Sequence, residues 1–313
     1  MRIHLGIPAS AIGPLALTIG NFDGVHLGHQ AMLHALSTAA QQLGLPTAAM
    51  TFEPHPREFF SPLDAPARLT TLREKLELLD KAGIDEVIVL RFNKALADTS
   101  AEVFISHLLV EQLQTRWLLV GDDFRFGARR MGHFETLQQA GLAQGFDCFS
   151  LSSILVDGQR ASSSAVREAL IAGQLKLASK LLGRPFSITG RVIPGQRLGR
   201  TLGYPTANLR LGRRIAPLSG IFAVTVKGLE DKALPAVASL GTRPTVTCQG
   251  EPLLEVHLFN FNRDIYGARI HVEFHHKIRD EAHFDSLDVL TQQIAHDADA
   301  ARDYFDQQHL SAS

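Results

Sequence analysis

The sequence predicts two domains of different fold class: an α/β domain with a parallel sheet, then an antiparallel β domain that ends in a helix. The chain has 313 residues, about twice the ~150 residues of an ordinary domain. Its first half alternates short apolar runs with helical patterns, which is typical of βαβ units around a parallel sheet. After about residue 183, glycines and prolines separate short runs of alternating apolar and polar residues, which indicates an antiparallel barrel or sandwich.

Apolar runs in the first half are the predicted strands of the parallel sheet: residues 15–19, 47–52, 87–92, 117–120 and 146–151. Between them, Thr71 with Glu74 and Thr99 with Glu102 have the spacing of capping boxes, so each pair predicts the start of a helix. Residues 54–66 include four prolines, and we expect an irregular surface loop there because proline interrupts regular structure.

Short alternating runs at residues 220–226, 253–259 and 269–274 are the predicted strands of the second domain. A final helix follows, in which apolar residues recur every three or four positions along one stripe: Leu287, Leu290, Ile294, Ala298, Ala301 and Phe305. We expect this stripe to pack on the β domain. A helix predicted over residues 165–182 ends at Gly183 and closes the first domain. The sequence Gly183-Arg184-Pro185 then predicts a boundary, with domains at residues 1–184 and 185–313.

Charge and cysteine content narrow the class of protein. Lys and Arg total 31 against 32 Asp and Glu, and the net charge of −1 offers no general attraction for nucleic acid. Cys148 and Cys248 are the only cysteines, which excludes a disulfide framework or a CxxC metal site and fits a reducing cytoplasm. The apolar stretch before Gly20 is interrupted by Pro8 and Pro14, and no run of about 18 apolar residues occurs. We therefore expect a cytoplasmic protein with neither a membrane nor a nucleic acid as partner. The sequence does not determine the oligomeric state.

A glycine-rich segment, GNFDGVHLGH at residues 20–29, links the first predicted strand to a helix. Such a turn directs backbone N–H groups and the positive end of the helix dipole at a bound phosphate. His26 and His29 stand three apart, so they share a face at the helix start and can both donate to phosphate oxygens. Taken alone, two histidines near a turn are more often ordinary surface residues. A zinc site is disfavoured, since helical zinc pairs usually stand four apart and no third ligand is nearby.

The whole ten-residue segment resembles the HxGH signature of the nucleotidyltransferase superfamily, which transfers a nucleotidyl group from ATP with loss of pyrophosphate. Two later segments favour the same interpretation. GDDFRFG at residues 121–127 follows the strand ending at Val120, where open α/β sheets bind their ligands. Arg160 and the serines at 162–164 precede the next helix, so hydroxyls, backbone N–H groups and Arg167 can converge on a triphosphate. An ordinary N-cap would explain one serine, but not this combination.

A second glycine-rich segment lies in the β domain at residues 195–208. Its glycines and arginines can close over phosphates, and it leads into a Pro-Thr-Ala-Asn turn. The Thr206 hydroxyl and the Asn208 carbonyl are hard oxygen ligands of the kind that Mg²⁺ accepts. The segment is not a Walker A motif, because the GK[ST] ending is missing.

Taken together, the motifs resemble those of the prokaryotic bifunctional riboflavin kinase and FMN adenylyltransferase family, also called FAD synthetases. The resemblance runs over essentially the full length and rests on the following segments: GNFDGVHLGH, TFEPHP at 51–56, GDDFRFG, SSSAVR at 162–167, GRTLGYPTAN at 199–208, GTRPT at 241–245, EVHLFNF at 255–261 and KIRDE at 277–281. It implies an N-terminal Rossmann-like nucleotidyltransferase domain and a C-terminal six-stranded antiparallel β-barrel. It further implies that riboflavin is phosphorylated to FMN, and FMN adenylylated to FAD, with ATP and Mg²⁺.

The resemblance also implies which residues do the work. In the first domain, His26 and His29 are the catalytic contacts to the ATP phosphates. The remaining residues of that ATP pocket are Gly20, Asn21, Phe22, Asp23, Gly24, Asp123, Arg160, Ser163 and Arg167. In the kinase, Glu255 is the base that accepts the riboflavin 5′-hydroxyl proton, and Thr206 and Asn208 hold Mg²⁺ and phosphate. The other implied phosphate contacts of the kinase are Gly195, Arg197, Gly199, Arg200 and Gly203.

Two alternatives from other classes remain. HxGH also occurs in class I aminoacyl-tRNA synthetases, so the first domain could transfer a nucleotidyl group to another acceptor, although no KMSKS-like segment or basic RNA-binding face is evident. The chain could also be a flavin-binding regulatory protein with a weakened kinase barrel, because Asn260 and Asn262 stand where related proteins often have acids. The flavin-contacting residues cannot be told from core residues, and Phe59 and Phe60 are the candidates.

Overall fold

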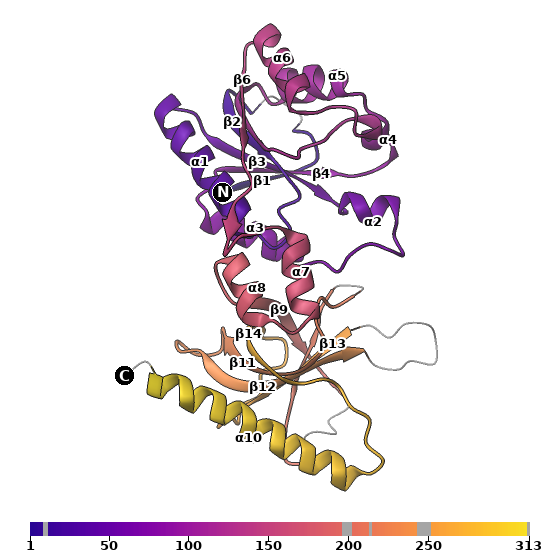
Figure 1. The fold of residues 1–313 in the computed structure, drawn as a ribbon, viewed down its shortest axis with the longest axis vertical. Coiled ribbons are helices and arrows are strands. Elements are labelled where there is room, and N and C mark those ends of the chain that lie inside the picture. Colours follow the sequence, from indigo (N-terminus) through magenta and orange to yellow (C-terminus); the bar gives the residue numbers. More distant parts are fainter. Residues whose placement is uncertain (9–11, 196–201, 213–214, 243–251, 312–313) are drawn as a thin grey trace. The chain divides into compact units, whose positions relative to one another are not determined.

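The computed structural model describes residues 1–8, 12–195, 202–212, 215–242 and 252–311. The chain forms two compact units, one with a parallel sheet and one with a barrel (Figure 1). The first comprises Met1–Pro66 and Leu72–Ser162, and the second comprises Ala67–Thr71 and Ser163–Ser313. No helix in these described ranges has an apolar stretch long enough to cross a bilayer.

The sheet of the first unit has six parallel strands in the order β1-β4-β3-β2-β5-β6. They are β1 (Arg2–Leu5), β2 (Leu15–Ile19), β3 (Thr47–Glu53), β4 (Glu86–Arg91), β5 (Thr115–Gly121) and β6 (Asp147–Leu151). All five predicted strands are confirmed. The edge strand β1 was not predicted, because its short run has no buried face to show as an apolar pattern. From the central β2, the chain adds β3 on one side and β5 on the other.

Helices cover both faces of this sheet. On one face α1 (Leu27–Leu43) and α3 (Leu72–Lys81) bury Leu33, Leu36 and Leu79 against β2 to β5. On the other face α5 (Ala101–Val103), the π-helix η1 (Phe104–Gln112) and α6 (Phe134–Gln144) bury Phe104 and Leu137. The remaining elements are α2 (Pro56–Phe60), α4 (Lys94–Asp98), the 3-10 helix η2 (Ala128–Arg130) and the hairpin strands β7 (Leu155–Val156) and β8 (Gln159–Arg160).

Two local predictions in this unit were wrong. The proline-rich segment is not wholly irregular, because Pro56 opens the short helix α2 at a position where its missing N–H is not needed, and His55 caps that helix. The capping box at Thr99 is displaced by one residue. Ser100 is the N-cap of α5 and accepts from the Val103 N–H at 3.3 Å, while the Thr99 hydroxyl donates to the Ala95 carbonyl at 2.8 Å.

The long helix predicted over residues 165–182 is also wrong, since it is two helices. They are α7 (Ser163–Ile171) and α8 (Leu175–Leu182), separated at Gly173, whose φ of +69° lies in the left-handed region. The predicted end at Gly183 is confirmed, with φ of 70° in a left-handed cap.

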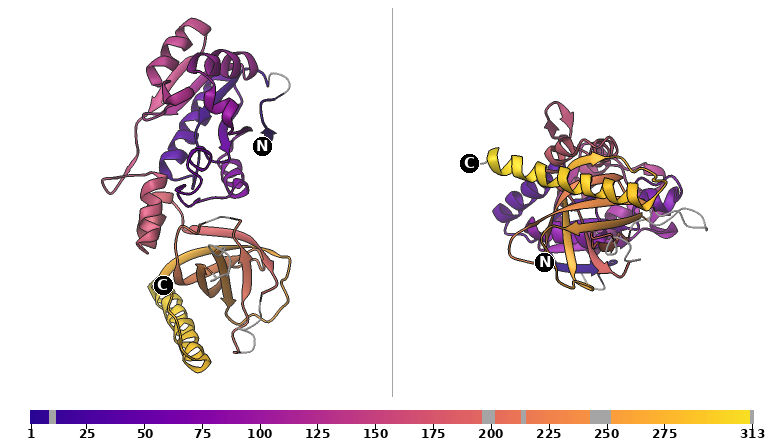
Figure 2. Two further views of the ribbon diagram at one scale, coloured as in Figure 1. Left: turned by 90° about the vertical axis from the view of Figure 1, so that its right-hand side faces the viewer. Right: turned by 90° about the horizontal axis from the view of Figure 1, so that it is seen from below.

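The second unit is built on a closed barrel of six antiparallel strands in the order β10-β13-β12-β11-β14-β9. They are β9 (Phe186–Ile193), β10 (Ala207–Arg210), β11 (Gly220–Lys227), β12 (Leu234–Thr242), β13 (Pro252–Leu258) and β14 (Arg269–Arg279). Alternate side chains point into the barrel, and Leu254 and Val256 are fully buried. The final helix α10 (Leu287–Ser311) lies along the outside (Figure 2). Its predicted stripe packs on the wall, where Ala298 and Ala301 are buried against Ile221 and Val237.

Candidate active sites

The first site lies where the strand order of the parallel sheet reverses. The connections from β2 and β5 lead away in opposite directions, so the loops after these neighbouring strands open a crevice at the carboxyl edge of the sheet. Residues 20–26 follow β2, and residues 122–127 follow β5. A side chain at Gly121 would lie 3.7 Å from the Met32 methyl, so the end of β5 packs closely on α1. The sheet topology therefore brings the two predicted segments to the same edge.

The turn after β2 has an unusual backbone. Phe22 and Val25 have φ of 48° and 41°, and Gly24 has φ of 81°. Non-glycine residues adopt this left-handed region at a cost that the surrounding structure must offset. Phe22 and Val25 are almost completely buried in the core beneath α1, which holds them in this conformation. A side chain at Gly20 would approach the Phe22 ring to 3.2 Å, so the entry to the turn has little room for one.

The two histidines stack at the start of α1. His26 is the N-cap, and its Nδ1 accepts from the His29 backbone N–H at 3.4 Å, so Nε2 carries the proton of the neutral ring. The ring centroids lie 3.7 Å apart with an interplanar angle of 24°, which confirms the shared face. A side chain at Gly28 would come within 3.1 Å of both the Ala161 carbonyl and the His26 ring. Glycine at position 28 therefore lets the ring and the backbone pack together.

The surroundings of His29 favour its neutral form. Burial lowers the pKa of His29 well below its usual value, and the neighbouring His26 and Lys75 lower it further. Its Nδ1 and the Asn21 Oδ1 are both shielded from solvent and have no hydrogen-bond partner within the described part of the chain. Buried polar atoms without partners are costly, so the turn holds unused hydrogen-bonding capacity for a ligand.

Lys75 is a charged residue of this site that sequence reasoning missed. It is 95% buried, and its Nζ donates to the Thr51 hydroxyl at 3.1 Å. That hydroxyl in turn donates to the Asn21 carbonyl at 3.2 Å. A sequence signal existed, because Lys75 stands three residues after Leu72 and four before Leu79, on the buried face of α3.

The other predicted residues of this site lie in three places. Asp123 and Arg160 come together in an ion pair of 2.7 Å. Asp23 is buried within the turn. Ser163 and Arg167 belong to the other compact unit, where Ser163 opens α7 and Arg167 Nε donates to the Ala67 carbonyl at 2.6 Å.

An exposed aromatic cluster stands near the carboxyl ends of β3 and β4. Phe59 and Phe60 of α2 meet the Phe92 ring edge-on, with centroids 5.5 and 5.6 Å apart. Phe60 is 65% exposed. The cluster gives this edge of the sheet an apolar surface on which a flat ring can stack.

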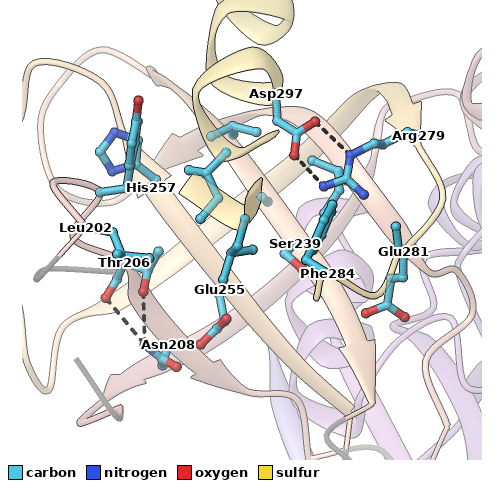
Figure 3. Close-up of a pocket in the computed structure, with 17 residues that line it drawn as sticks. Leu202, Thr206, Asn208, Ser239, Glu255, His257, Arg279, Glu281, Phe284 and Asp297 are labelled. Atoms are coloured by element: carbon cyan, nitrogen blue, oxygen red, sulfur yellow. Dashed lines mark hydrogen bonds and ion pairs between the residues drawn. The ribbon is translucent and has the colours of Figure 1, made fainter. Parts of the chain in front are cut away.

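The second site is a cavity of about 340 Å³ between the outer wall of the barrel and α10 (Figure 3). The predicted Thr206, Asn208 and Glu255 all line it. The other lining residues are Leu202, Tyr204, Ile221, Val237, Ala238, Ser239, His257, Arg279, Glu281, Ala282, Phe284, Leu290, Ile294 and Asp297. The barrel therefore brings the three predicted kinase residues into one pocket.

The floor of this cavity is a single row of cross-strand neighbours. Asn208 on β10 pairs with Glu255 on β13, and Glu255 pairs with Ser239 on β12. Ser239 pairs with Ile221 on β11, which pairs in turn with Arg279 on β14. Four strand spacings of about 4.8 Å make this row about 19 Å long along the wall. Strand register thus sets the order of the polar and apolar groups.

Asn208 is held at one end of the row. Its Nδ2 lies 3.4 Å from the Thr206 carbonyl and 3.5 Å from the Thr206 hydroxyl, both of which accept from it. A side chain at Gly195 would lie 2.5 Å from this amide, so it would displace the amide. Gly203, a predicted phosphate contact, has φ of 86°, which lies in the left-handed region that favours glycine. The predicted Arg197, Gly199 and Arg200 lie outside the described residues.

An ion pair that sequence reasoning missed closes the other end of the row. Arg279 Nε and Nη2 donate to the two carboxylate oxygens of Asp297 at 2.8 and 2.6 Å, and Asp297 is only 5% exposed. The pair joins β14 to α10 and so fixes the helix over the cavity. Asp297 stands between Ile294 and Ala301 on the apolar stripe of α10, and this break in the stripe was a usable signal.

The donor set at Thr206 and Asn208 fits Mg²⁺. In the described ranges, no group of three or more His, Cys, Asp and Glu side chains is placed to hold a metal ion. A cation at the barrel site would therefore rely on neutral protein oxygens together with substrate phosphates. Mg²⁺ in nucleotide sites is held in this way, with few protein ligands.

Comparisons with known proteins cover nearly the whole chain. The family model of FAD synthetase matches residues 10–165, and that of riboflavin kinase matches residues 182–305. A bifunctional riboflavin kinase/FMN adenylyltransferase of Escherichia coli (strain K12) is 51% identical over 289 residues, which is 92% of each chain. The Haemophilus influenzae protein of the same name is 49% identical over 93% of this chain and 94% of its own. A crystal structure described as a macrolide-efflux protein from Streptococcus pneumoniae has a TM-score of 0.83 and 29% identity, covering 96% of this chain and 99% of that one.

Proposed function

The chain belongs to the family of bifunctional riboflavin kinases/FMN adenylyltransferases, and from this premise we propose how its two sites divide the work. It is an enzyme that phosphorylates riboflavin with ATP to give FMN, then adenylylates FMN with a second ATP to give FAD and pyrophosphate. We assign the adenylylation to residues 1–184 and the phosphorylation to residues 185–313. The observation that carries the assignment is the convergence of Thr206, Asn208 and Glu255 in one cavity of the barrel.

In the kinase step, Glu255 accepts the proton of the riboflavin 5′-hydroxyl as that oxygen attacks the γ-phosphorus of ATP, and the bond from that phosphorus to the bridging oxygen breaks to release ADP. Thr206 and Asn208 hold Mg²⁺, which when bound offsets charge on the transferred phosphoryl group. Because Asn208 and Glu255 are cross-strand neighbours, a hydroxyl at the base lies beside a phosphoryl group held at the amide. Correct placement of the two reactants supplies much of the rate in such transfers.

In the adenylylation step, the FMN phosphate is already an anion, so its attack on the α-phosphorus of ATP needs no base. The barrier lies in the negative charge that develops on departing pyrophosphate. We assign its stabilisation to N–H donors from His26 and His29, with the buried Lys75 adding a fixed positive charge nearby. Asp123 and Arg160 complete the proposed ATP pocket within the first unit, and Phe59 and Phe60 are the proposed flavin contacts.

One observation bears on the regulatory alternative. Asn260 follows β13 with φ of +52°, a left-handed conformation that Asn adopts more readily than most residues. The left-handed backbone therefore explains an Asn at position 260 without reference to catalysis. This observation favours an active kinase over a weakened barrel that only binds flavin.

We place the reactions in the cytoplasm, with small molecules as the partners. Burial raises the pKa of the Cys148 thiol to about 12, which keeps it protonated and unreactive toward disulfide formation. The net charge of −1 gives no reason to expect nucleic acid as a partner.

The test is to incubate the purified chain with riboflavin, ATP and Mg²⁺ and to separate FMN from FAD by chromatography. We expect FMN to appear first and FAD to follow, and chelation of Mg²⁺ to stop the first step. FMN alone would refute the first-domain assignment, and flavin binding without turnover would support the regulatory alternative. Retention of tRNA by the chain would support the synthetase-like alternative.

A further inference from the structure

The barrel cavity contains a histidine that the proposed mechanism does not use. His257 lies on β13 two residues after Glu255, so the two side chains share the outer face of the wall, and both line the cavity. Figure 3 shows His257 on the same side of the cavity as Thr206 and Asn208. The ring is half-buried, and its Nδ1 lies 2.9 Å from the Pro205 carbonyl oxygen. His257 therefore contacts the residue that directly precedes Thr206, a proposed Mg²⁺ ligand.

This hydrogen bond defines which ring nitrogen of His257 carries the proton. Burial lowers the pKa of His257 from its usual value of 6.5, and Arg302 lowers it further, against the opposing effect of the hydrogen bond to Pro205. At pH 7 the ring is therefore neutral and has one N–H group. Because a carbonyl oxygen can only accept, that proton is on Nδ1 and Nε2 is unprotonated. His26 in the other domain has the opposite tautomer, since its Nδ1 accepts.

The His257 ring holds the turn before Thr206 at two points. Besides donating to the Pro205 carbonyl, it meets the Tyr204 ring edge-on, with the centroids 5.3 Å apart and an interplanar angle of 71°. The contacts from the Asn208 amide to Thr206 are longer, at 3.4 and 3.5 Å, and so are weak hydrogen bonds. The bond from His257 is the shorter and stronger restraint, so the place of the Thr206 hydroxyl depends on it.

The barrel wall and α10 fix the ring of His257 in turn. Phe259, two residues further along the chain, meets this ring edge-on with the centroids 5.9 Å apart. The Arg302 guanidinium of α10 lies 4.5 Å from the centroid of Phe259, which is only 6% exposed and packs with Ala298 and Ala301. The donor that reaches the turn is therefore anchored on the packed wall and helix.

We propose that His257 is a positioning residue of the kinase site, which donates from Nδ1 to the Pro205 carbonyl and so holds Thr206 where its hydroxyl can bind Mg²⁺. This inference rests on the proposed function of the barrel. Groups that orient a metal ligand typically change metal affinity or activity by about 10-fold to 100-fold when they are removed. Only the N–H donor acts on the carbonyl, so the effect should follow the donor and not the bulk of the ring.

The first test compares two substitutions that each keep one property of the ring. His257→Asn keeps a side-chain N–H close to the position of Nδ1 but has less volume, whereas His257→Leu keeps more of the volume and has no donor. We expect His257→Leu to raise the Mg²⁺ concentration for half-maximal riboflavin phosphorylation by about 10-fold and to lower kcat. His257→Asn should stay within about 3-fold of the unmodified enzyme, because it keeps the donor.

Two further readings separate positioning from general damage to the barrel. The KM for riboflavin should change by less than about 2-fold in both variants, because Thr206 is proposed to hold the cation and not the flavin. The matched control is His271→Leu, which removes another half-buried histidine of the barrel. The His271 Nδ1 lies 2.8 Å from the Thr189 hydroxyl, and neither residue lines the cavity. This variant should keep the Mg²⁺ requirement of the unmodified enzyme, and far-UV circular dichroism shows whether each variant is folded.

The second test uses the unmodified protein and does not measure activity. In protein labelled with ¹⁵N-histidine, NMR at about pH 8 distinguishes protonated from unprotonated ring nitrogens, because neutral histidines have one of each. We expect His257 to have a protonated Nδ1 and an unprotonated Nε2, and His26 to show the reverse. A protonated Nε2 with a bare Nδ1 at His257 would overturn the proposal, because such a ring cannot donate to Pro205.

Failure of this proposal can be told from failure of the proposed function. If His257→Leu keeps the parent Mg²⁺ requirement, or lies closer to the parent than His257→Asn does, the positioning role is overturned while the kinase assignment stands. If the unmodified enzyme does not phosphorylate riboflavin, the proposed function fails, and the positioning role fails with it.

Discussion

The two sites differ in what positions their functional groups. In the first domain the groups stand on turns at the carboxyl edge of a parallel sheet, where left-handed residues such as Phe22 and Val25 shape the backbone. In the barrel they stand on the strands themselves, and register places Asn208, Glu255 and Ser239 side by side. A site whose residues stand on turns depends on the local sequence. A site whose residues stand on paired strands depends on the strand register, and so on the whole barrel.

The two sites also differ in charge, in the way their reactions require. The crevice in the first domain has a buried cation at Lys75 and a neutral His29, which suits a phosphate nucleophile that is already ionised. The barrel row places the carboxylate of Glu255 between the neutral Asn208 and Ser239. An alcohol nucleophile needs such a base. The contrast predicts that each reaction can be removed without the other.

The largest expected effect is that of Glu255→Gln. Without a carboxylate to accept the hydroxyl proton, FMN formation from riboflavin should fall by about 10³-fold, within the usual range for a general base. FAD formation from supplied FMN should remain at the parent rate. Both rates are measured on the same preparation by separating FMN from FAD. Unchanged kinase turnover would contradict the assignment of the base.

His29→Ala is the complementary change. Loss of one preorganised donor should slow FAD formation from FMN by about 10²-fold and leave riboflavin phosphorylation unchanged. His34→Ala serves as a control on the same helix α1, outside the turn. If His29→Ala makes FAD as fast as the parent, the histidine pair does not stabilise pyrophosphate.

The same contrast explains how much could be predicted from sequence. The strand β2 and the turn after it were predicted closely, because a fully buried strand appears as a mainly apolar run, here with Thr18 as the one polar residue, and the turn is one contiguous segment. The break at Gly173 was missed, because a glycine inside a helical pattern can either continue the helix or end it. The cap at Ser100 was missed, because the adjacent Thr99 and Ser100 can each serve as an N-cap.

The barrel row could be predicted only in part. Asn208 was found from the chemistry of the glycine-rich segment and Glu255 through the family resemblance, but their neighbours Ser239, Ile221 and Arg279 were not singled out. Register between strands far apart in the chain is a property of the closed barrel, and no local pattern encodes it.

A substitution at Gly195 of the barrel tests whether phosphorylation depends on the position of the Asn208 amide. Gly195→Ala would place a methyl group 2.5 Å from the Asn208 amide, so the amide must move away from its position beside Glu255. We expect a fall of about 10-fold to 100-fold in riboflavin phosphorylation, because small displacements of positioning groups are costly. FAD formation from FMN should be unaffected. Gly212→Ala is the control for backbone strain alone, because its φ of +60° disfavours a side chain while nothing lies within 4 Å of that position and no lining residue is changed.

The smallest expected effect concerns barrel stability rather than chemistry. Hydrogen bonds from His271 and Lys227, against the opposing effect of burial, lower the pKa of Glu273 to about 2. A lowered pKa means that the ionised carboxylate stabilises the folded state above its unfolded pKa of about 4.3, and that this contribution is lost as pH falls through about 2. At pH 7, Glu273→Gln should therefore reduce the free energy of unfolding of the barrel by about 1 to 2 kcal/mol after allowance for solvent screening.

The chain offers a way to assign this effect to one unit. Trp117, the single tryptophan, lies in β5, so its fluorescence reports denaturant unfolding of the first unit, whereas far-UV circular dichroism reports both units. We expect Glu273→Gln to shift the circular dichroism transition and to leave the tryptophan transition in place. The difference from the parent should shrink as the measurement moves from pH 7 toward pH 3, and the exposed Glu230→Gln should show neither change. A shift in the Trp117 transition would mean that the two units do not unfold independently, and the separation between the two regions would then hold for their chemistry alone.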